Sequence, residues 1–365
     1  MNKYHGRMKM CFINMRNFWG HYVCMFFFMF SCIFSTSPSH VEASSLYAWR
    51  TNDIDHAEDL HQRKILFEHV SLLTGIPWNY LAAMDQYERS MQANRSLKQV
   101  ESLQRIIAIT IPENTWTGML NPNPQDTDPY TISFYQGIGR DGSGDGVANR
   151  HDDLDVLATV IAVLHKHGKR EEDLLIGLWD YYQNPRAVER IQQFAKIFTT
   201  YETLDLKQHT FPLSTKSSYA YQSTWGAKRG WGGRRIHEGS DIFARGGTPV
   251  GSTCFGVVEE LGWNAYGGWR IGIRDLDNYY HYYAHLSGFD KQIKVGDVVK
   301  PGLTIGWVGS SGYGKPGTTG KFPPHLHYGL YRDRGQHDGS FDPYPLLKKW
   351  EREAKLAAPK NKLKK

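Results

Sequence analysis

The apolar residues of this 365-residue chain change their spacing near residue 200, and this change constrains the fold more than any other feature. Between about residues 46 and 198 they recur every three or four positions, as in Leu157, Ile161 and Leu164, which is typical of amphipathic helices. After Trp225 they form short runs, rich in β-branched and aromatic residues, that glycine-containing turns separate. We therefore predict an α+β protein with a small α-helical domain followed by a mostly antiparallel β domain. The predicted strands lie at 248–258, 269–274, 279–285, 304–308 and 325–331.

Local signals refine this division. Leu66, Val70 and Leu73 form one predicted helical stripe that Gly75 ends, and Asn184 precedes Pro185 as an N-cap does at the start of a helix. Between the two halves, Thr, Ser, Lys and Gln replace the apolar pattern and predict a linker. The predicted segments are a targeting segment at 1–43, a helical domain at 44–200, the linker at 201–224, a β domain at 225–350 and a basic tail at 351–365.

The N-terminal segment has the pattern of an export signal. Basic residues precede an apolar stretch at 22–34 that is short for a membrane span, and small residues follow up to Ala43. We expect export with cleavage near Ala43, and an uncleaved membrane anchor is the alternative. Cleavage would leave Cys254 as the one cysteine of the mature chain, so internal disulfides are not expected.

The net charge is modest, at a formal +6, and part of it lies in the C-terminal lysines. Such a tail is either simply solvated or attracted to a polyanion such as cell wall or a membrane surface. The chain carries no motif of a nucleic-acid-binding module.

Two short motifs about eighty positions apart indicate a metal site. His237 and Asp241 lie four positions apart, and His325 and His327 lie at i and i+2 of a predicted strand, so both imidazoles project from one face. Imidazole and carboxylate are zinc ligands, and a catalytic site uses three of them and keeps a position for water. The predicted ligands are His237, Asp241 and one of His325 and His327, while the other histidine faces substrate.

With the Tyr-Ala-His-Leu-Ser strand around His285, these motifs resemble the lysostaphin-like zinc endopeptidases of peptidase family M23. The resemblance covers about 225–347. It implies that His237, Asp241 and His327 bind zinc and that His325 and His285 are catalytic. His325 would act as general base and His285 would stabilise the oxyanion, although the two roles can be exchanged.

A second candidate site is an Asp- and Gly-rich loop in the helical half. Its oxygen donors lie at the spacing of a calcium-binding loop, with Gly146 at the sixth position. The alternative is a turn that caps the following helix. The candidate calcium ligands are Asp141, Ser143, Asp145, Asn149 and Asp152.

Residues 75–88 and this loop resemble lysozyme-like lytic transglycosylase domains, in which a glutamate at the position of Glu88 is the catalytic acid. Arg89 replaces the serine expected next, and the downstream glycine-rich glutamine motif is missing. We therefore expect a degenerate domain that binds or positions cell wall. Glycan cleavage through Glu88 is the alternative.

The two-part layout resembles sporulation L-Ala-D-Glu endopeptidases of Bacillus relatives, on phrases such as Phe-Asp-Pro-Tyr-Pro at 341–345. This resemblance implies zinc-dependent cleavage of peptidoglycan stem peptides at the cell wall or the membrane–wall interface, in forespore or spore cortex. A noncatalytic envelope-binding module on the same fold is the rival hypothesis. The sequence leaves the oligomeric state and the bond cleaved open.

Overall fold

The computed structural model describes residues 56–94, 105–230 and 233–357. The predicted targeting segment at 1–43 lies outside these residues, so its export or anchoring stays a prediction. Within the described residues, no helix combines the length and the apolar character needed to cross a membrane.

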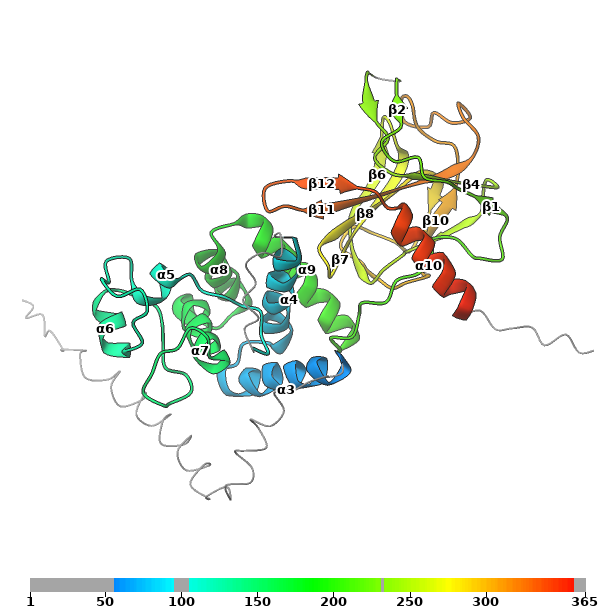
Figure 1. The fold of residues 1–365 in the computed structure, drawn as a ribbon. Helices are drawn as coiled ribbons and strands as arrows, with labels where there is room; N and C mark the ends of the chain where they lie inside the picture. Colours follow the sequence, from blue (N-terminus) through cyan, green and yellow to red (C-terminus); the bar gives the residue numbers. More distant parts are fainter. Residues whose placement is uncertain (1–55, 95–104, 231–232, 358–365) are drawn as a thin grey trace, which may run out of the picture. The chain divides into compact units, whose positions relative to one another are not determined.

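The first half of the described chain is helical, as predicted (Figure 1). Asn184 caps α9 by accepting a hydrogen bond from the backbone N–H of Arg186, and Pro185 occupies the first turn. The helices are α3 (His56–Thr74), α4 (Trp78–Asn94), α5 (Glu113–Thr117), α6 (Pro129–Phe134), α7 (Asp153–Leu164), the 3₁₀ helix η3 (His165–His167), α8 (Glu171–Tyr182) and α9 (Pro185–Tyr201).

One predicted helical stripe is wrong at its end. Leu73 is 57% exposed, whereas Phe67 is fully buried. The buried face of α3 also includes Arg63, whose guanidinium pairs with the buried Asp85 of α4 at 2.5 Å. The spacing of apolar residues alone does not predict this buried face, because a buried ion pair forms part of it.

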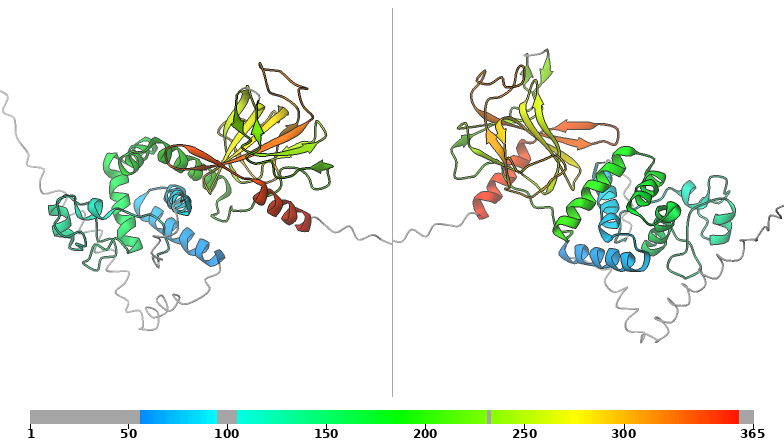
Figure 2. Two further views of the ribbon diagram at one scale, coloured as in Figure 1. Left: turned by 45° about the horizontal axis from the view of Figure 1, so that its top comes forward. Right: turned by 180° about the vertical axis from the view of Figure 1, so that it is seen from behind.

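The second half is an antiparallel β domain (Figures 1 and 2). The main sheet has the order β1-β4-β11-β8-β7-β6-β9, with β10 paired to β5 and β8, and β12 paired to β11. The strands are β1 (Tyr219–Ala220), β2 (Lys228–Arg229), β3 (Arg235–Ile236), β4 (Ser240–Ala244), β5 (Pro249–Gly251), β6 (Gly256–Asn264), β7 (Gly268–Asp275), β8 (Tyr279–Phe289), β9 (Val298–Val299), β10 (Thr304–Val308), β11 (His325–Asp333) and β12 (Asp338–Phe341).

Helix α10 (Tyr344–Ala357) packs against the β core, because Leu347 and Trp350 are buried together with sheet residues such as Tyr328.

Part of the predicted linker also belongs to this core. Phe211 and Leu213 are buried in it, and β1 pairs with β4. A two-residue strand has no measurable periodicity, so the sequence could not indicate it. The predicted domain boundaries stay predictions.

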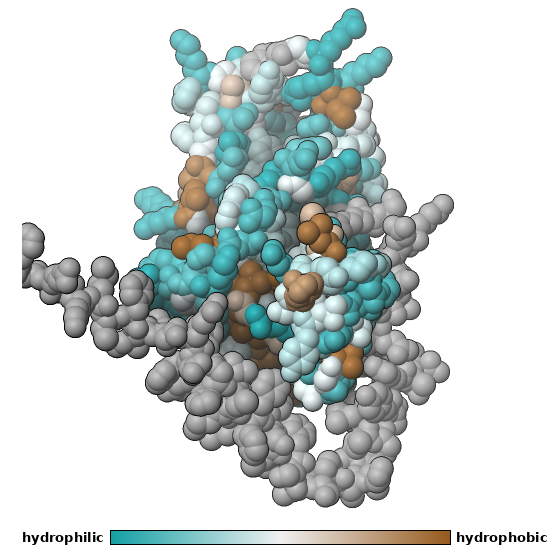
Figure 3. Space-filling model, turned by 90° about the vertical axis from the view of Figure 1, so that its left-hand side faces the viewer, coloured by the Kyte–Doolittle hydropathy of each residue, from teal (hydrophilic) through white to brown (hydrophobic). Residues whose placement is uncertain are grey.

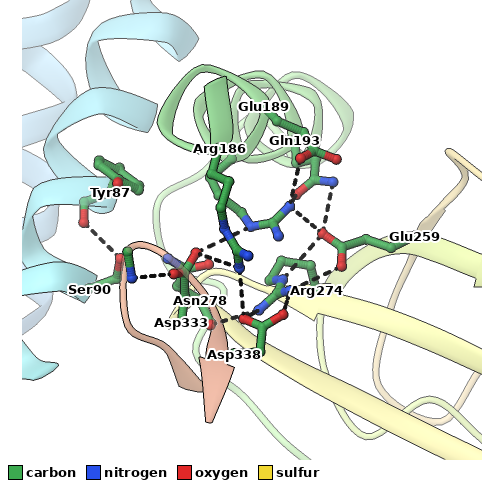
Figure 4. A network of polar contacts seen from close by, with 12 residues as sticks. Tyr87, Ser90, Arg186, Glu189, Gln193, Glu259, Arg274, Asn278, Asp333 and Asp338 are labelled. Atoms are coloured by element: carbon green, nitrogen blue, oxygen red, sulfur yellow. Dashed lines mark hydrogen bonds and ion pairs between the residues drawn. The ribbon is translucent and has the colours of Figure 1, made fainter. Parts of the chain in front are cut away.

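Ion pairs connect α9 with the β domain (Figure 4). Arg190 contacts Glu259 of β6 at 2.5 Å, and Arg186 contacts Asp338 of β12 at 3.0 Å. Arg274 of β7, which is 1% exposed, bridges Glu259 and Asp338 at 3.1 Å each. These opposite charges offset one another, so their burial does not leave an uncompensated charge.

The described surface in Figure 3 is mostly hydrophilic, with apolar side chains in small separate groups. Large apolar side chains exposed in the helical half include Met119, Leu120 and Phe134.

Candidate metal centre

Two paired strands bring the predicted ligands together. Asp241 lies on β4 and His327 lies opposite it on β11, in an antiparallel pair whose register places these two residues across from each other. His237 precedes β4, and its backbone N–H donates to the carbonyl of Ala227. The sequence motifs far apart in the chain thus meet because β4 and β11 are neighbours.

The three ligand atoms lie close to one another. His237 Nε2 is 3.0 Å from Asp241 Oδ1 and 2.9 Å from His327 Nδ1, and His327 Nδ1 is 3.1 Å from Asp241 Oδ1. Ligands about 2.0–2.1 Å from a tetrahedral zinc ion are roughly 3.3 Å from each other. The donor set and its spacing therefore fit zinc.

The hydrogen bonding of His237 also suits a metal ligand. Its Nδ1 lies 3.0 Å from the carbonyl of Thr224, which can only accept, so this nitrogen carries the proton. In the neutral ring, Nε2 then carries a lone pair that is directed at Asp241. A ligating histidine is commonly oriented in this way by a carbonyl on its other nitrogen.

Gly239 allows the ligand loop to pass close to β11. A Cβ added there would lie 2.7 Å from Cε1 and 2.8 Å from Nε2 of His327, and 2.6 Å from the Tyr328 carbonyl oxygen. These distances are well below van der Waals contact, so a side chain at this position would displace His327.

His285 and His325 lie beside the three candidate ligands. Their ring centroids are 4.8 Å apart, and His325 Nε2 is 3.6 Å from Asp241 Oδ1. His285 Nδ1 contacts the Ser311 carbonyl and His325 Nδ1 contacts the Pro323 carbonyl, both at 2.8 Å. Each neutral ring therefore keeps Nε2 unprotonated and able to accept a proton.

The backbone of His285 is unusual, with a φ of 61°, which is in the left-handed region. Non-glycine residues seldom adopt this conformation, and it is concentrated at functional sites. Here it coincides with irregular register between β8 and its neighbours β7 and β10.

Burial sets the ionisation of these groups. Burial lowers the pKa of His325 and His327, and it lowers the pKa of His285 to about 3, with the neighbouring histidines adding to the effect. For Asp241 burial alone would raise the pKa, but the interactions with His237 and His327 outweigh burial and lower the pKa. The centre thus favours neutral imidazoles around an ionised carboxylate, which is the protonation state that binds a cation.

Two further residues of the site, Arg229 and Phe322, lie outside the predicted motifs. Arg229 donates a 2.7 Å hydrogen bond to Asp241 Oδ2, the oxygen that does not face the two histidine ligands. Phe322 packs against His285 and His325, with ring centroids 4.6 and 5.1 Å apart. An arginine in a Gly- and Arg-rich stretch and a phenylalanine in a loop carry no spacing signal that could have identified them.

The predicted calcium loop is held by its own backbone. Asp141 accepts hydrogen bonds from the N–H groups of Gly144 and Gly146, and Asp152 caps α7 by accepting from Leu154 and Asp155. Asp152 therefore has the capping role that the alternative interpretation gave it. Calcium binding by Asp141, Ser143, Asp145, Asn149 and Asp152 stays a prediction.

Glu88, on α4, lines a cavity of about 620 Å³ together with Tyr87 and Tyr182. Arg332 and Arg334, from the β11–β12 hairpin, line the same cavity. A glycosidic general acid must be protonated at the leaving oxygen. The predicted degenerate role of this region and the alternative of glycan cleavage through Glu88 both stay predictions.

An antiparallel sheet that presents two histidines and an aspartate around one point, with two further neutral histidines beside them, is the arrangement of a metal-dependent hydrolase. The chain belongs to peptidase family M23, whose members are zinc metallopeptidases, and its residues 235–340 match that family.

A relative from Bacillus subtilis, an L-Ala–D-Glu endopeptidase, is 54% identical over 293 residues, which cover 80% of this chain and 89% of that protein. Lysostaphin of Staphylococcus staphylolyticus is 40% identical over 115 residues, which cover 31% of this chain and 22% of that protein. Among solved structures, the catalytic domain of the antimicrobial peptidase lysostaphin from Staphylococcus simulans is 34% identical, with a TM-score of 0.30, and the match covers 36% of this chain and 92% of that one.

Proposed function

We propose that this chain is an exported zinc endopeptidase that hydrolyses an amide bond in the stem peptides of peptidoglycan, with His237, Asp241 and His327 as ligands. The observation that carries the proposal is the 2.9–3.1 Å spacing of their ligand atoms beside two neutral histidines. The 54% identity to an endopeptidase over most of the chain supports the same conclusion.

Zinc bound by these ligands would act as a Lewis acid toward the scissile carbonyl and lower the pKa of a bound water toward neutrality. Arg229 supports the ligand set, because its hydrogen bond to Asp241 Oδ2 leaves Oδ1 directed at the two histidines. Phe322 covers one side of the two remaining imidazoles and keeps water from that side.

His325 is the proposed general base. Its Nδ1 proton is held by the Pro323 carbonyl, so its free Nε2 accepts the proton of the attacking water and later returns it to the leaving amine. His285 has the same tautomer, with Nδ1 directed at the Ser311 carbonyl, and its ring centroid lies 4.8 Å from that of His325. It is the proposed oxyanion stabiliser. Because its pKa is lowered in the free site, its Nε2 would take up a proton only as negative charge develops beside it, and the two roles can be exchanged.

The finer proposal is that the cleaved bond joins L-Ala to D-Glu and that the enzyme acts on spore cortex, from outside the membrane. The name of the Bacillus subtilis relative and its match to 80% of this chain support this bond. Export by the N-terminal segment, with or without retention in the membrane, would bring the enzyme to its substrate.

The test is digestion of purified peptidoglycan by the full chain, followed by mass spectrometry of the products, with and without a chelator. We expect new amino termini on D-Glu that disappear with the chelator and in a His237→Ala variant. Cut glycan with intact stem peptides, or equal digestion by His237→Ala, would contradict the proposal. New amino termini at another residue would retain the peptidase and refute only the assigned bond.

A further inference from the structure

A second group of two histidines and an aspartate lies away from the candidate metal centre. His209 belongs to the segment between α9 and β1, Asp275 ends β7 and His281 lies on β8. Their ligand atoms all lie within 4.8 Å of one another. Asp275 Oδ2 is 2.8 Å from His281 Nε2 and 3.3 Å from His209 Nε2, and all three side chains are at least largely buried.

The tautomer of His209 leaves a lone pair in this group. Its Nδ1 is 2.9 Å from the carbonyl of Lys207, which can only accept, so Nδ1 carries the proton. In the neutral ring Nε2 is then a bare acceptor that faces the Asp275 carboxylate. Two acceptors at this distance repel each other unless a proton or a cation lies between them.

This arrangement repeats that of His237 in the first centre. There too a backbone carbonyl holds Nδ1 and directs Nε2 at an aspartate oxygen, with a second histidine nitrogen within about the same distance. The spacings of 2.8 and 3.3 Å in the second group are close to the roughly 3.3 Å between ligands of a tetrahedral zinc ion.

The surroundings of His281 can orient it as a ligand. Its Nδ1 lies 2.7 Å from the Tyr328 hydroxyl and 2.8 Å from the Thr253 hydroxyl, both of which can accept a proton from Nδ1 and so free Nε2. Trp350 of α10 stacks on His209 with 4.9 Å between ring centroids and shields the group from solvent.

We propose that His209 Nε2, Asp275 Oδ2 and His281 Nε2 bind a second divalent ion of the zinc type. The ion is structural. It fastens the segment that follows α9 to the β7–β8 end of the sheet, next to α10, and it is independent of the catalytic ion.

The test counts metal ions in the full chain. Wild type and variants are stripped with a chelator, reloaded with Zn²⁺ at neutral pH, freed of excess metal by gel filtration and analysed by mass spectrometry for zinc. We expect two equivalents in wild type, one in His237→Ala, one in His209→Gln and none in the double variant. His167→Gln, which removes a histidine of η3, is the matched control and keeps two.

The competing state needs no metal. Burial lowers the pKa of His209, but the carboxylate of Asp275 outweighs burial and raises it, so an imidazolium could fill the same gap. One equivalent in wild type together with none in His237→Ala would establish that state and overturn the proposal. Melting gives a second readout that does not need the His209 variant. Zn²⁺ should raise the Tm of His237→Ala by several degrees, and an unchanged Tm overturns the proposal.

Discussion

Substituting Gly239 by alanine tests the geometry of the candidate metal centre without removing a ligand. The new Cβ would lie 2.7 Å from Cε1 of His327. Carbon atoms prefer about 3.5 Å, so the His327 ring or the ligand loop must move by about 0.8 Å. A shift of this size in a catalytic group costs roughly 10²-fold in rate.

We therefore expect Gly239→Ala to lower kcat/KM for peptidoglycan fragments by about 10²-fold. Zinc content after gel filtration should fall as well, and the Tm of the metal-free chain should fall too, because the Cβ also meets the backbone carbonyl oxygen of Tyr328 at 2.6 Å. Gly246→Ala is the matched control, because its Cβ would meet only Pro324 at 3.8 Å or more, which is ordinary contact. If Gly239→Ala retained wild-type zinc content and activity, the placement of His327 against the ligand loop would be refuted.

Three further predictions concern His325 and Glu88. His325→Gln should lower kcat by about 10²- to 10⁴-fold and keep its zinc, measured by steady-state kinetics and metal analysis, and a loss of zinc would make His325 a ligand instead. Because burial lowers the pKa of His325, its neutral, proton-accepting form persists below the ordinary value of 6.5, so kcat/KM should rise with pH on an acid limb whose midpoint lies below 6.5. A midpoint above 6.5 would exclude His325 as that base. Glu88→Gln should leave peptide cleavage within about twofold and alter no glycan product, and mass spectrometry that found glycan cleavage lost in the variant would restore Glu88 as a catalytic acid.

The sequence predicted those helices and strands in which the regular spacing of apolar residues extends over many positions. The spacing of apolar residues in α7 and α9 predicted helices, and the predicted strand at 304–308 coincides with β10. Short elements were not accessible, because β1 and β9 have two residues each and no period. The exposure of Leu73 could not be predicted either, since it depends on which face of α3 the other helices cover.

The amino-acid sequence by itself determined the helical and β halves, the histidines and the aspartate with metal-ligand chemistry, and the family resemblance, because these depend on residue type and on spacing along the chain. Only the tertiary structure decided which atoms meet. The pairing of β4 with β11 brings Asp241 to His327, carbonyls of distant residues fix the tautomers of His237 and His285, and packing against α10 gathers His209 with His281. Contacts between residues far apart in sequence carry no local signal, since they arise when the elements pack.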